Sequence, residues 1–176
     1  MLTIKPGSLQ ALWETSLGGT SLLATEAASG TGTYVTGQGV DKIFDKNFNT
    51  SYSSRGDYND TGSDSNAGLN TGFFFMITGC QTTLTKFRFA PGVIASADPS
   101  YVIVEGTNCV SAVNCSSWTP LYSGTGGIAS ITNRSSFGNF EYISSPKALS
   151  GYRFTVVTKR SSSPYVSYSE VEVYGY

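Results

Sequence analysis

The sequence predicts an all-β protein, a sandwich or barrel of roughly eight to nine short strands. Its apolar residues fall in short runs separated by segments rich in Gly, Ser and Thr, which is the pattern of strands joined by turns. Aromatic residues are plentiful, with 11 Tyr, 10 Phe and 2 Trp. No predicted strand alternates with a convincing helical pattern, which argues against a parallel α/β sheet.

Individual strands are expected where apolar residues cluster or alternate. The run Phe73-Phe74-Phe75-Met76-Ile77 is continuously apolar, which predicts a strand buried on both faces. Ser100–Glu105 shows the period-2 alternation of a strand, whereas Arg55–Asn70 is expected to form a long polar loop. The expected strands span 21–28, 51–54, 72–78, 84–90, 100–105, 118–122, 139–143, 151–158 and 167–174.

The chain divides into a lead-in segment, residues 1–20, and one domain, residues 21–176. Residues 9–13 of the lead-in fit either a short helical turn or a strand, and Gly18-Gly19 ends this element. We expect the lead-in to pack Trp13 on the domain. The domain is long enough to bury its own core.

Composition excludes several classes of function. Charged residues make up 13% of the chain and the net charge is −1, which argues against a nucleic-acid partner or an anionic membrane surface. The chain has no His, so it lacks the commonest general base and the commonest zinc ligand. It also has no apolar stretch of the length that spans a membrane.

An enzymatic function is not expected. The sequence has no His and no nucleophile motif, and the carboxylates considered for catalysis lie in the polar loop. Asp57, Asp60 and Asp64 could form a glycosidase-like carboxylate pair, but spaced Asp residues in a polar loop more often serve solubility. We therefore expect a binding module and no catalytic residues.

Two segments at opposite ends of the domain carry oxygen donors. The segment 43–50 reads as a tight polar loop with donors at Asp45, Asn47 and Thr50. The closing run 169–175 reads as a final strand whose edge carries the Glu170 carboxylate. If the fold brings them together, they form an all-oxygen site for a hard cation such as calcium. The alternative is that Asp45 and Thr50 only cap a turn.

Six motifs in order resemble the discoidin or coagulation-factor C-type domain, whose superfamily includes family 32 carbohydrate-binding modules and fucolectins. The resemblance covers about residues 21–176 and implies a jelly-roll β-sandwich of about eight antiparallel strands, described as galactose-binding-domain-like. The motifs are Phe44-Asp45-x-Asn47-x-x-Thr50, Gly72-Phe73, Ala97-Asp98-Pro99-Ser100 with the strand to Asn108, Ser117-Trp118-Thr119-Pro120-Leu121, Gly151-Tyr152-Arg153-Phe154 and Ser169-Glu170-Val171-Glu172-Val173.

The resemblance implies a structural calcium ion, because a calcium ion in relatives ties the Asp loop to the last strand. By position, Asp45 and Glu170 would supply carboxylates, and Thr50 its hydroxyl and carbonyl oxygens. Lys42 and Asn47 would supply backbone oxygens, with Ser169 as a further candidate.

The chain also departs from the family pattern. Lys46 replaces the usual Gly after the Asp, and Tyr52 replaces the usual Trp. Ser53 stands where sugar-binding members often carry a His, and the Arg and Asn of the galactose-binding loop have no match in Ala90–Asp98. The fold is therefore expected to carry over, whereas galactose specificity is not.

Ligand contacts are expected in loops, because binding residues often lie on loops that a rigid scaffold holds in position. Loops 30–39, 55–67, 91–98 and 159–165 should converge on one end of the sandwich. A sugar site needs planar hydrogen-bonding groups and an aromatic surface, and Arg55 with Tyr58 supplies both. The alternative for each residue is ordinary solvated surface. The candidate ligand-binding residues are Tyr34, Arg55, Asp57, Tyr58, Asn59, Asp98, Arg160 and Tyr165.

Arg55-Gly56-Asp57 also spells the tripeptide read by integrins. A three-residue match is common by chance, so this is a side hypothesis only.

The cysteines and sequons point weakly to an extracellular or cell-surface protein. Cys109 and Cys115 bracket five residues and suit a disulfide that closes a loop, leaving Cys80 over. The alternative is that all three are reduced. N-glycosylation sequons begin at Asn49, Asn59, Asn114 and Asn133.

The sequence thus predicts a non-catalytic, lectin-like carbohydrate-binding or adhesion module with a structural calcium ion. Its partner would be a glycan on a cell surface, a matrix or a polysaccharide. The alternative is a structural or assembly domain that contacts protein partners or copies of itself.

Overall fold

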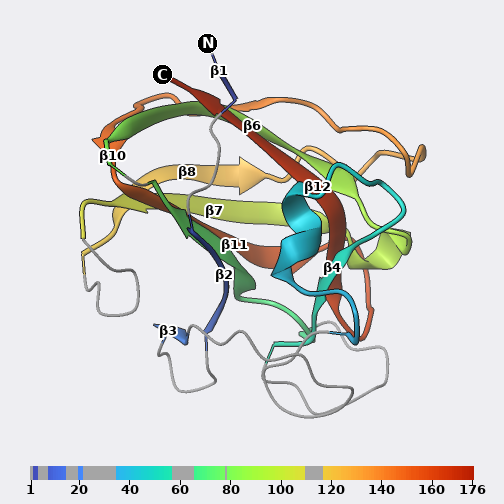
Figure 1. Ribbon diagram of the computed structural model, residues 1–176. Helices are drawn as coiled ribbons and strands as arrows, with labels where there is room; N and C mark the ends of the chain where they lie inside the picture. Colours follow the sequence, from blue (N-terminus) through green and yellow to red (C-terminus); the bar gives the residue numbers. More distant parts are fainter. Residues whose placement is uncertain are drawn as a thin grey trace.

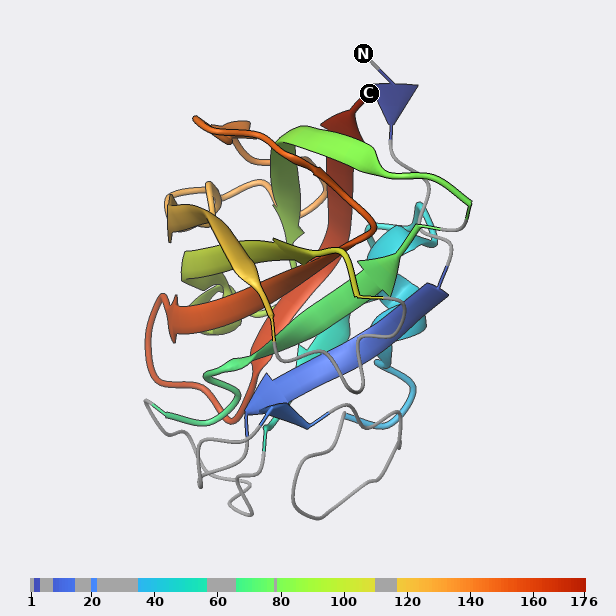
Figure 2. The ribbon, with the colours of Figure 1, turned by 90° about the vertical axis from the view of Figure 1, so that its left-hand side faces the viewer.

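The computed structural model describes residues 2–3, 8–14, 20–21, 35–56, 66–77, 79–109 and 117–176, with side chains from residue 35 onward. Two antiparallel β-sheets stack face to face (Figures 1 and 2). Two short 3-10 helices, η1 (Val40–Phe44) and η2 (Ala95–Ala97), lie between strands. The expected all-β jelly-roll sandwich is confirmed.

The first sheet is built around the last strand, β12 (Val166–Gly175), which pairs on one side with β6 (Thr82–Pro91). Its other side pairs with β1 (Leu2–Thr3) and β4 (Tyr52–Ser54), and β6 also pairs with β9 (Glu141–Tyr142) and β10 (Ala148–Leu149). The pairing of β12 with β6 shifts register between Tyr168 and Glu170. Ser169 is the extra residue of this β-bulge, and bulges re-aim the side chains beside them.

The second sheet has the order β3-β2-β5-β11-β7-β8. Its strands are β3 (Thr20–Ser21), β2 (Ser8–Glu14), β5 (Thr71–Met76), β11 (Gly151–Lys159), β7 (Pro99–Thr107) and β8 (Thr119–Thr125). β5 is buried on both faces, as its apolar run predicts. Phe73 and Phe75 join the main core, whereas Phe74 packs with Met76 and Trp118 on the opposite face.

The described part of the lead-in belongs to the sandwich. β1 pairs with β12 of the first sheet, and β2 lies between β3 and β5 of the second sheet. Residues 8–14 therefore adopt the strand rather than the helical alternative. Of the strand expected over Ser21–Ala28, only Ser21 is described, as the end of β3. The packing of the Trp13 side chain lies outside the described side chains.

The core between the sheets is dominated by aromatic rings. Phe73 of β5 stacks on Phe154 of β11, with ring centroids 4.8 Å apart and planes 6° apart. Phe87 of β6 meets the same Phe154 ring edge-on at 5.3 Å, which joins the two sheets. The buried Tyr52 hydroxyl donates to the Gly72 carbonyl at 2.9 Å, which offsets the cost of burying it.

Gly72 is required by the close approach of β5 and β11. A Cβ atom built at this position would lie 1.8 Å from the Phe154 carbonyl oxygen. The Gly72-Phe73 pair therefore combines a residue without a side chain, which admits the neighbouring strand, with a large ring that fills the core.

The structure describes some of the cysteines and sequons and leaves others outside the described residues. Cys80 is a free, exposed cysteine. Cys115 lies outside the described residues, so the Cys109–Cys115 disulfide stays a prediction. Asn49 and Asn133 are exposed, whereas Asn59 and Asn114 lie outside the described residues. No helix in the described part of the chain is long and apolar enough to cross a membrane.

The aromatic core generates a stability prediction. Phe73→Ala should lower the free energy of unfolding by about 3–5 kcal/mol, because it removes a fully buried ring and leaves a cavity against Phe154. Chemical denaturation monitored by tryptophan fluorescence measures this change. Val93→Ala is the control: Val93 is 72% exposed and its truncation should cost less than about 0.5 kcal/mol. Equal losses for the two variants would contradict the assigned core.

Candidate functional site

The loop that follows η1 is closed by its own side chains. Asp45 Oδ1 accepts a hydrogen bond from the Asn47 N–H at 2.9 Å, and the Thr50 hydroxyl donates to Asp45 Oδ2 at 2.6 Å. The Asn49 N–H donates to Asn47 Oδ1 at 3.0 Å. Lys46 adopts a φ of 63°, which is a left-handed backbone conformation. Glycine, the usual residue at this position in the discoidin family, would adopt this conformation with less steric strain. The loop keeps its shape although it lacks that glycine.

Glu170 of β12 reaches this loop. The Asn47 N–H also donates to Glu170 Oε1 at 2.9 Å, and the Glu170 side chain is almost fully buried. Burial and the neighbouring Asp45 carboxyl raise the pKa of Glu170 to about 8. For Asp45, burial acts in the opposite direction, but hydrogen bonds with Thr50, Glu170 and Asn47 lower its pKa overall. The predicted meeting of the Asp loop with the last strand is therefore present in the structure.

The donor set fits a hard cation. Two carboxylates, Asp45 and Glu170, lie side by side with the oxygens of Thr50 and Asn47, and carboxylate, hydroxyl and carbonyl oxygens are the ligands that calcium takes. The neighbouring Lys42 ammonium pairs with Asp41 at 2.6 Å. The described residues contain no group of three or more His, Cys, Asp or Glu side chains suited to a metal, so carbonyls and water would have to complete the six to eight ligands.

Ser169 stands apart from the other predicted ligands. Its buried hydroxyl donates to the Pro91 carbonyl at 2.9 Å. This bond fastens the β-bulge to β6, and Glu170, the next residue, meets the Asp45 loop.

Three of the four expected loops meet at one end of the sandwich. The Arg160 N–H donates to the Asp98 carbonyl at 2.9 Å, and the Ser161 N–H donates to the Ser96 carbonyl at 3.0 Å. Between the loops lies a cavity of about 390 Å³, which we call the loop-end cavity. Its lining residues are Thr36, Gly37, Gln38, Asn49, Thr50, Ser51, Val93, Ile94, Tyr165 and Ser167.

The loop-end cavity combines apolar and neutral polar surface. Val93 and Ile94 are exposed to 72% and 41%, respectively, although both are large aliphatic residues. Tyr165 contributes an aromatic ring, and every residue of the lining is uncharged. Such a mixture can hold a small amphipathic ligand by apolar contact and by hydrogen bonds.

One of the predicted ligand residues, Tyr165, lines this cavity, and a second, Arg55, lies next to Tyr165. Burial raises the pKa of Tyr165, and the positive charge of Arg55 opposes that rise, so the two side chains are neighbours. The Arg55 Nε is buried and has no hydrogen-bond partner among the described residues. Gly56 is buried, so the first two residues of the Arg55-Gly56-Asp57 tripeptide do not project together into solvent.

Asp98 has a different environment. Its side chain is fully buried and forms a bidentate ion pair with Arg134, in which the Nη1–Oδ2 distance is 2.7 Å. Arg160 lies 3.7 Å from the same carboxylate. Burial raises the pKa of Asp98, while both arginines act against that rise. Asp98 therefore fastens neighbouring loops and has no surface to offer a ligand.

The remaining predicted ligand residues, Tyr34, Asp57, Tyr58 and Asn59, lie outside the described residues. Ser53, at the family's His position, is buried and shares a hydrogen bond of 2.7 Å with the Ser167 hydroxyl.

Sequence reasoning missed Arg134 and the Val93-Ile94 pair. Arg134 also donates to the Gly92 carbonyl at 2.7 Å. The two residues are far apart in the chain, so no local sequence pattern could predict this contact. An apolar pair inside an expected loop was a visible signal for Val93 and Ile94.

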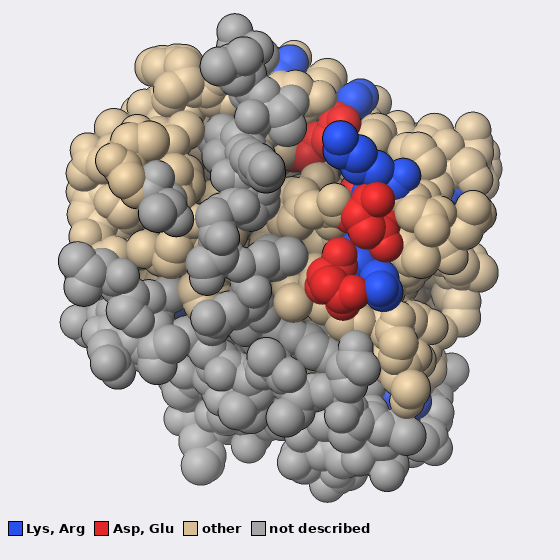
Figure 3. Space-filling view, viewed as in Figure 1, with Lys and Arg blue, Asp and Glu red and all other residues tan. Residues whose placement is uncertain are grey.

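Charge is balanced on the face that carries η1 and β12. Figure 3 shows acidic and basic side chains gathered in one band in which both signs are mixed. Arg88 and Glu172 form one such pair, at 2.6 Å. The described residues of this face therefore present no broad field of one sign to a polyelectrolyte.

Solved structures of carbohydrate-binding modules share this fold. CBM32-3 from a family 31 glycoside hydrolase of Clostridium perfringens aligns with a TM-score of 0.63 at 15% identity, covering 99% of this chain and 95% of that chain. CBM32 of AlyQ, in complex with 4,5-unsaturated mannuronic acid, aligns with a TM-score of 0.60 at 14% identity, covering 99% and 98%. CpGH89CBM32-5 from Clostridium perfringens, in complex with GalNAc-β-1,3-galactose, aligns with a TM-score of 0.57 at 10% identity, covering 95% and 94%.

No protein-family model matches the chain, and no curated protein matches it in sequence. The structural likeness confirms the expected galactose-binding-domain-like fold.

The Asp98 cluster generates a prediction on stability. Asp98→Ala should lower the free energy of unfolding by about 3–5 kcal/mol, because it leaves Arg134 without its buried partner. Arg160→Ala removes an exposed member of the cluster and should cost less than about 1 kcal/mol. Thermal and urea unfolding of both variants measures the difference, and a larger loss for Arg160→Ala would reverse the assigned roles.

Proposed function

We propose that the protein is a carbohydrate-binding module that holds a glycan, without catalysis, in the loop-end cavity. The observation that carries this proposal is the pairing of an aromatic and aliphatic rim with neutral hydrogen-bonding groups. Tyr165, Val93 and Ile94 offer surfaces for the C–H faces of a sugar, while Gln38 and Asn49 offer amides for its hydroxyls. The sugar-bound modules of the same fold support this reading.

The neighbouring Arg55 extends the site. Its guanidinium can donate several hydrogen bonds in one plane, which suits vicinal hydroxyls. The proposal includes an extracellular or cell-surface location, where the glycan partner would belong to a matrix, a cell surface or a polysaccharide.

The same proposal includes a structural calcium ion held by Asp45, Glu170 and Thr50, with backbone oxygens of Asn47 and Lys42. The ion would neutralise two adjacent carboxylates and cross-link the loop to β12. The proximity of the two carboxyl groups, which both accept a hydrogen bond from the Asn47 N–H, supports this assignment, because a cation there would stabilise both charges.

Glycan binding is tested by a glycan-array screen followed by calorimetry with the best ligand. One shallow site should bind with a Kd of about 0.1–1 mM, which is roughly 4–5 kcal/mol. Tyr165→Ala and Arg55→Ala should each weaken binding by tenfold or more, on the order of 1.5–3 kcal/mol for charge-assisted bonds of Arg55. Tyr176→Ala, at an exposed tyrosine on the chain end, is the control and should bind as the wild type does.

If a glycan binds equally to wild type, Tyr165→Ala and Arg55→Ala, the loop-end assignment is wrong. If no glycan binds while the protein self-associates or captures a defined protein partner, the assembly alternative replaces this function.

Calcium is tested by unfolding with and without chelator. Chelation should lower the melting temperature and added calcium should restore it, because an ion that binds only the folded state stabilises that state. Glu170→Gln should lose the calcium response, whereas Glu141→Gln, whose carboxylate accepts from the Tyr122 hydroxyl at 2.8 Å, should keep it. A chelated protein that is metal-free by elemental analysis yet melts unchanged would exclude a structural ion.

A further inference from the structure

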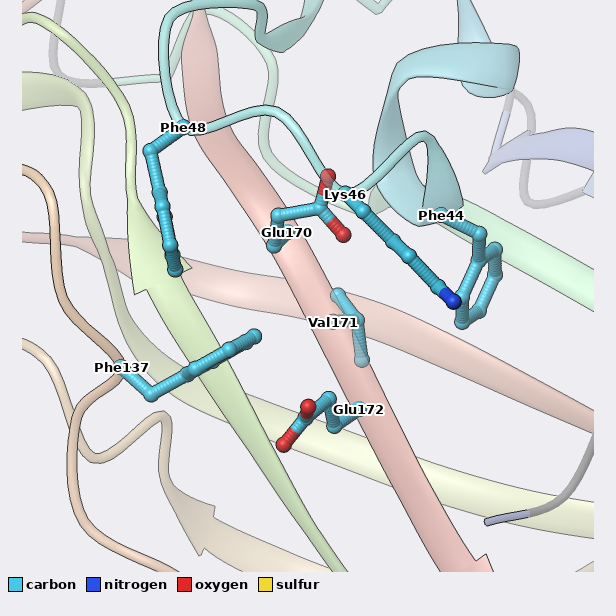
Figure 4. Close-up of a pocket in the computed structure, with 7 residues that line it drawn as sticks. All are labelled: Phe44, Lys46, Phe48, Phe137, Glu170, Val171 and Glu172. Atoms are coloured by element: carbon cyan, nitrogen blue, oxygen red, sulfur yellow. The ribbon is translucent and has the colours of Figure 1, made fainter.

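A second cavity lies on the outer face of the first sheet, and it shares no lining residue with the loop-end cavity. It has a volume of about 480 Å³ and lies between the loop after η1, strand β12 and the segment that carries Phe137 (Figure 4). We call it the sheet-face cavity. Its lining residues are Phe44, Lys46, Phe48, Phe137, Glu170, Val171 and Glu172.

Two phenylalanines form an aromatic corner in this cavity. The rings of Phe48 and Phe137 come from distant parts of the sequence and meet with centroids 5.2 Å apart at an interplanar angle of 72°. In Figure 4 both rings stand on one side of β12, opposite Phe44 and Lys46. An aromatic corner gives apolar surface in two directions, which suits a saturated ring that presents C–H groups on a face and along an edge.

The corner is fixed before any ligand arrives. The Arg88 guanidinium lies 4.4 Å from the Phe137 ring centroid and 4.5 Å from that of Phe140. Arg88 itself is held by Glu172, with Nε–Oε2 and Nη2–Oε2 distances of 2.7 and 2.6 Å. Since side chains that are already ordered lose little entropy on binding, this arrangement favours a ligand site.

Glu172 retains an acceptor oxygen to which none of the described residues donates. Arg88 contacts Glu172 Oε2 through both Nε and Nη2. The Tyr174 hydroxyl donates to the same oxygen at 2.7 Å. No described residue donates to Oε1, and the side chain is 29% exposed. Arg88 and Tyr174 thus orient the carboxylate and leave Oε1 available to a ligand hydroxyl.

Lys46 supplies the complementary donor. It is exposed and forms no ion pair with a described residue, and Figure 4 shows its side chain extending along the cavity toward Phe44. The cavity therefore has an ammonium donor on one wall, a free carboxylate oxygen on the β12 wall and aromatic surface opposite Lys46.

We propose that the sheet-face cavity is a second carbohydrate-binding site, selective for a neutral pyranose. A purely apolar ligand would leave the Lys46 ammonium and Glu172 Oε1 without partners. A uronate or a phosphosugar would place its charge beside the Glu172 carboxylate, which costs binding energy. A neutral pyranose satisfies the donor, the acceptor and the aromatic corner together.

A second site changes how the protein binds polymers. Two sites on one module let a polysaccharide, or a surface with many glycans, engage the same molecule twice, and the second contact is then favoured by its high effective concentration. Binding to a polymer should accordingly be tighter than binding to its monosaccharide.

The test is an NMR titration of uniformly ¹⁵N-labelled protein with methyl glycosides of glucose, galactose, mannose and N-acetylgalactosamine, and with methyl glucuronide. Concentrations up to the order of 10 mM cover weak single sites. At least one neutral glycoside should shift the amide signals of Phe48, Phe137 and Glu172, and methyl glucuronide should bind more weakly than the best neutral glycoside.

Two variants separate binding from folding. Lys46→Gly removes the ammonium and places glycine at a left-handed position, so it should fold at least as well as the wild type and bind the glycoside about tenfold or more weakly at the sheet-face cavity. Phe137→Ala should weaken the same shifts. Tyr165→Ala, at the loop-end cavity, should leave them unchanged.

The outcomes distinguish this inference from the proposed function. Shifts confined to loop-end residues overturn the second site and support the proposed function. Shifts at the sheet-face cavity that survive both Lys46→Gly and Phe137→Ala overturn it as well, as does methyl glucuronide binding as tightly as the best neutral glycoside. Shifts at the sheet-face cavity alone, lost in both variants, support the second site and overturn the loop-end assignment.

Discussion

The contact between the Asp45 loop and strand β12 is the constraint on which both candidate sites depend. The Asn47 N–H donates to a buried carboxylate, Glu170, across 123 positions of sequence. Phe48 of the same loop lines the sheet-face cavity, and Asn49 and Thr50 line the loop-end cavity. Since hydrogen bonds inside the loop fix its shape, one long-range contact sets a wall of each cavity.

The core supplies the rigid support for this loop. Phe44, at the end of η1, meets the rings of Phe73 and Phe75 edge-on at 5.8 and 6.3 Å. Those rings belong to the central strand β5, whose position against β11 requires Gly72. The 3-10 helix is thus anchored in the aromatic core on one side and carries the polar loop on the other. Function can vary in such loops while the sheets stay the same.

Modules with 10–15% identity to this chain share its fold because a sandwich needs alternating burial and turns rather than particular residues. Residues that contact a ligand cannot be exchanged as freely without changing what is bound. Ser53 is buried against Ser167, and Asp98 is enclosed by Arg134, so two positions that could have contacted a sugar serve the scaffold instead. Binding specificity must then come from other residues, which is the general reason that a shared fold does not imply a shared ligand.

The sequence by itself determined the fold class, the strand buried on both faces at β5, and the chemistry of the Asp45 loop. These features follow from local patterns: the period-2 alternation, the continuous apolar run, and the spacing of Asp45, Asn47 and Thr50 within one turn. The resemblance to the discoidin family added the pairing of that loop with Glu170, which no local pattern could supply.

Only the tertiary structure decided which polar residues line a cavity and which are buried in the scaffold. It placed residues 8–14 inside the second sheet, put the extra residue of the β-bulge at Ser169 and brought Phe48 to Phe137. Each of these depends on contacts between segments far apart in the chain, and the identity of a residue does not encode its distant neighbours. Asp98 and Tyr165 looked alike as loop residues in the sequence, yet burial beside Arg134 made one a structural anchor, while the other lines a cavity.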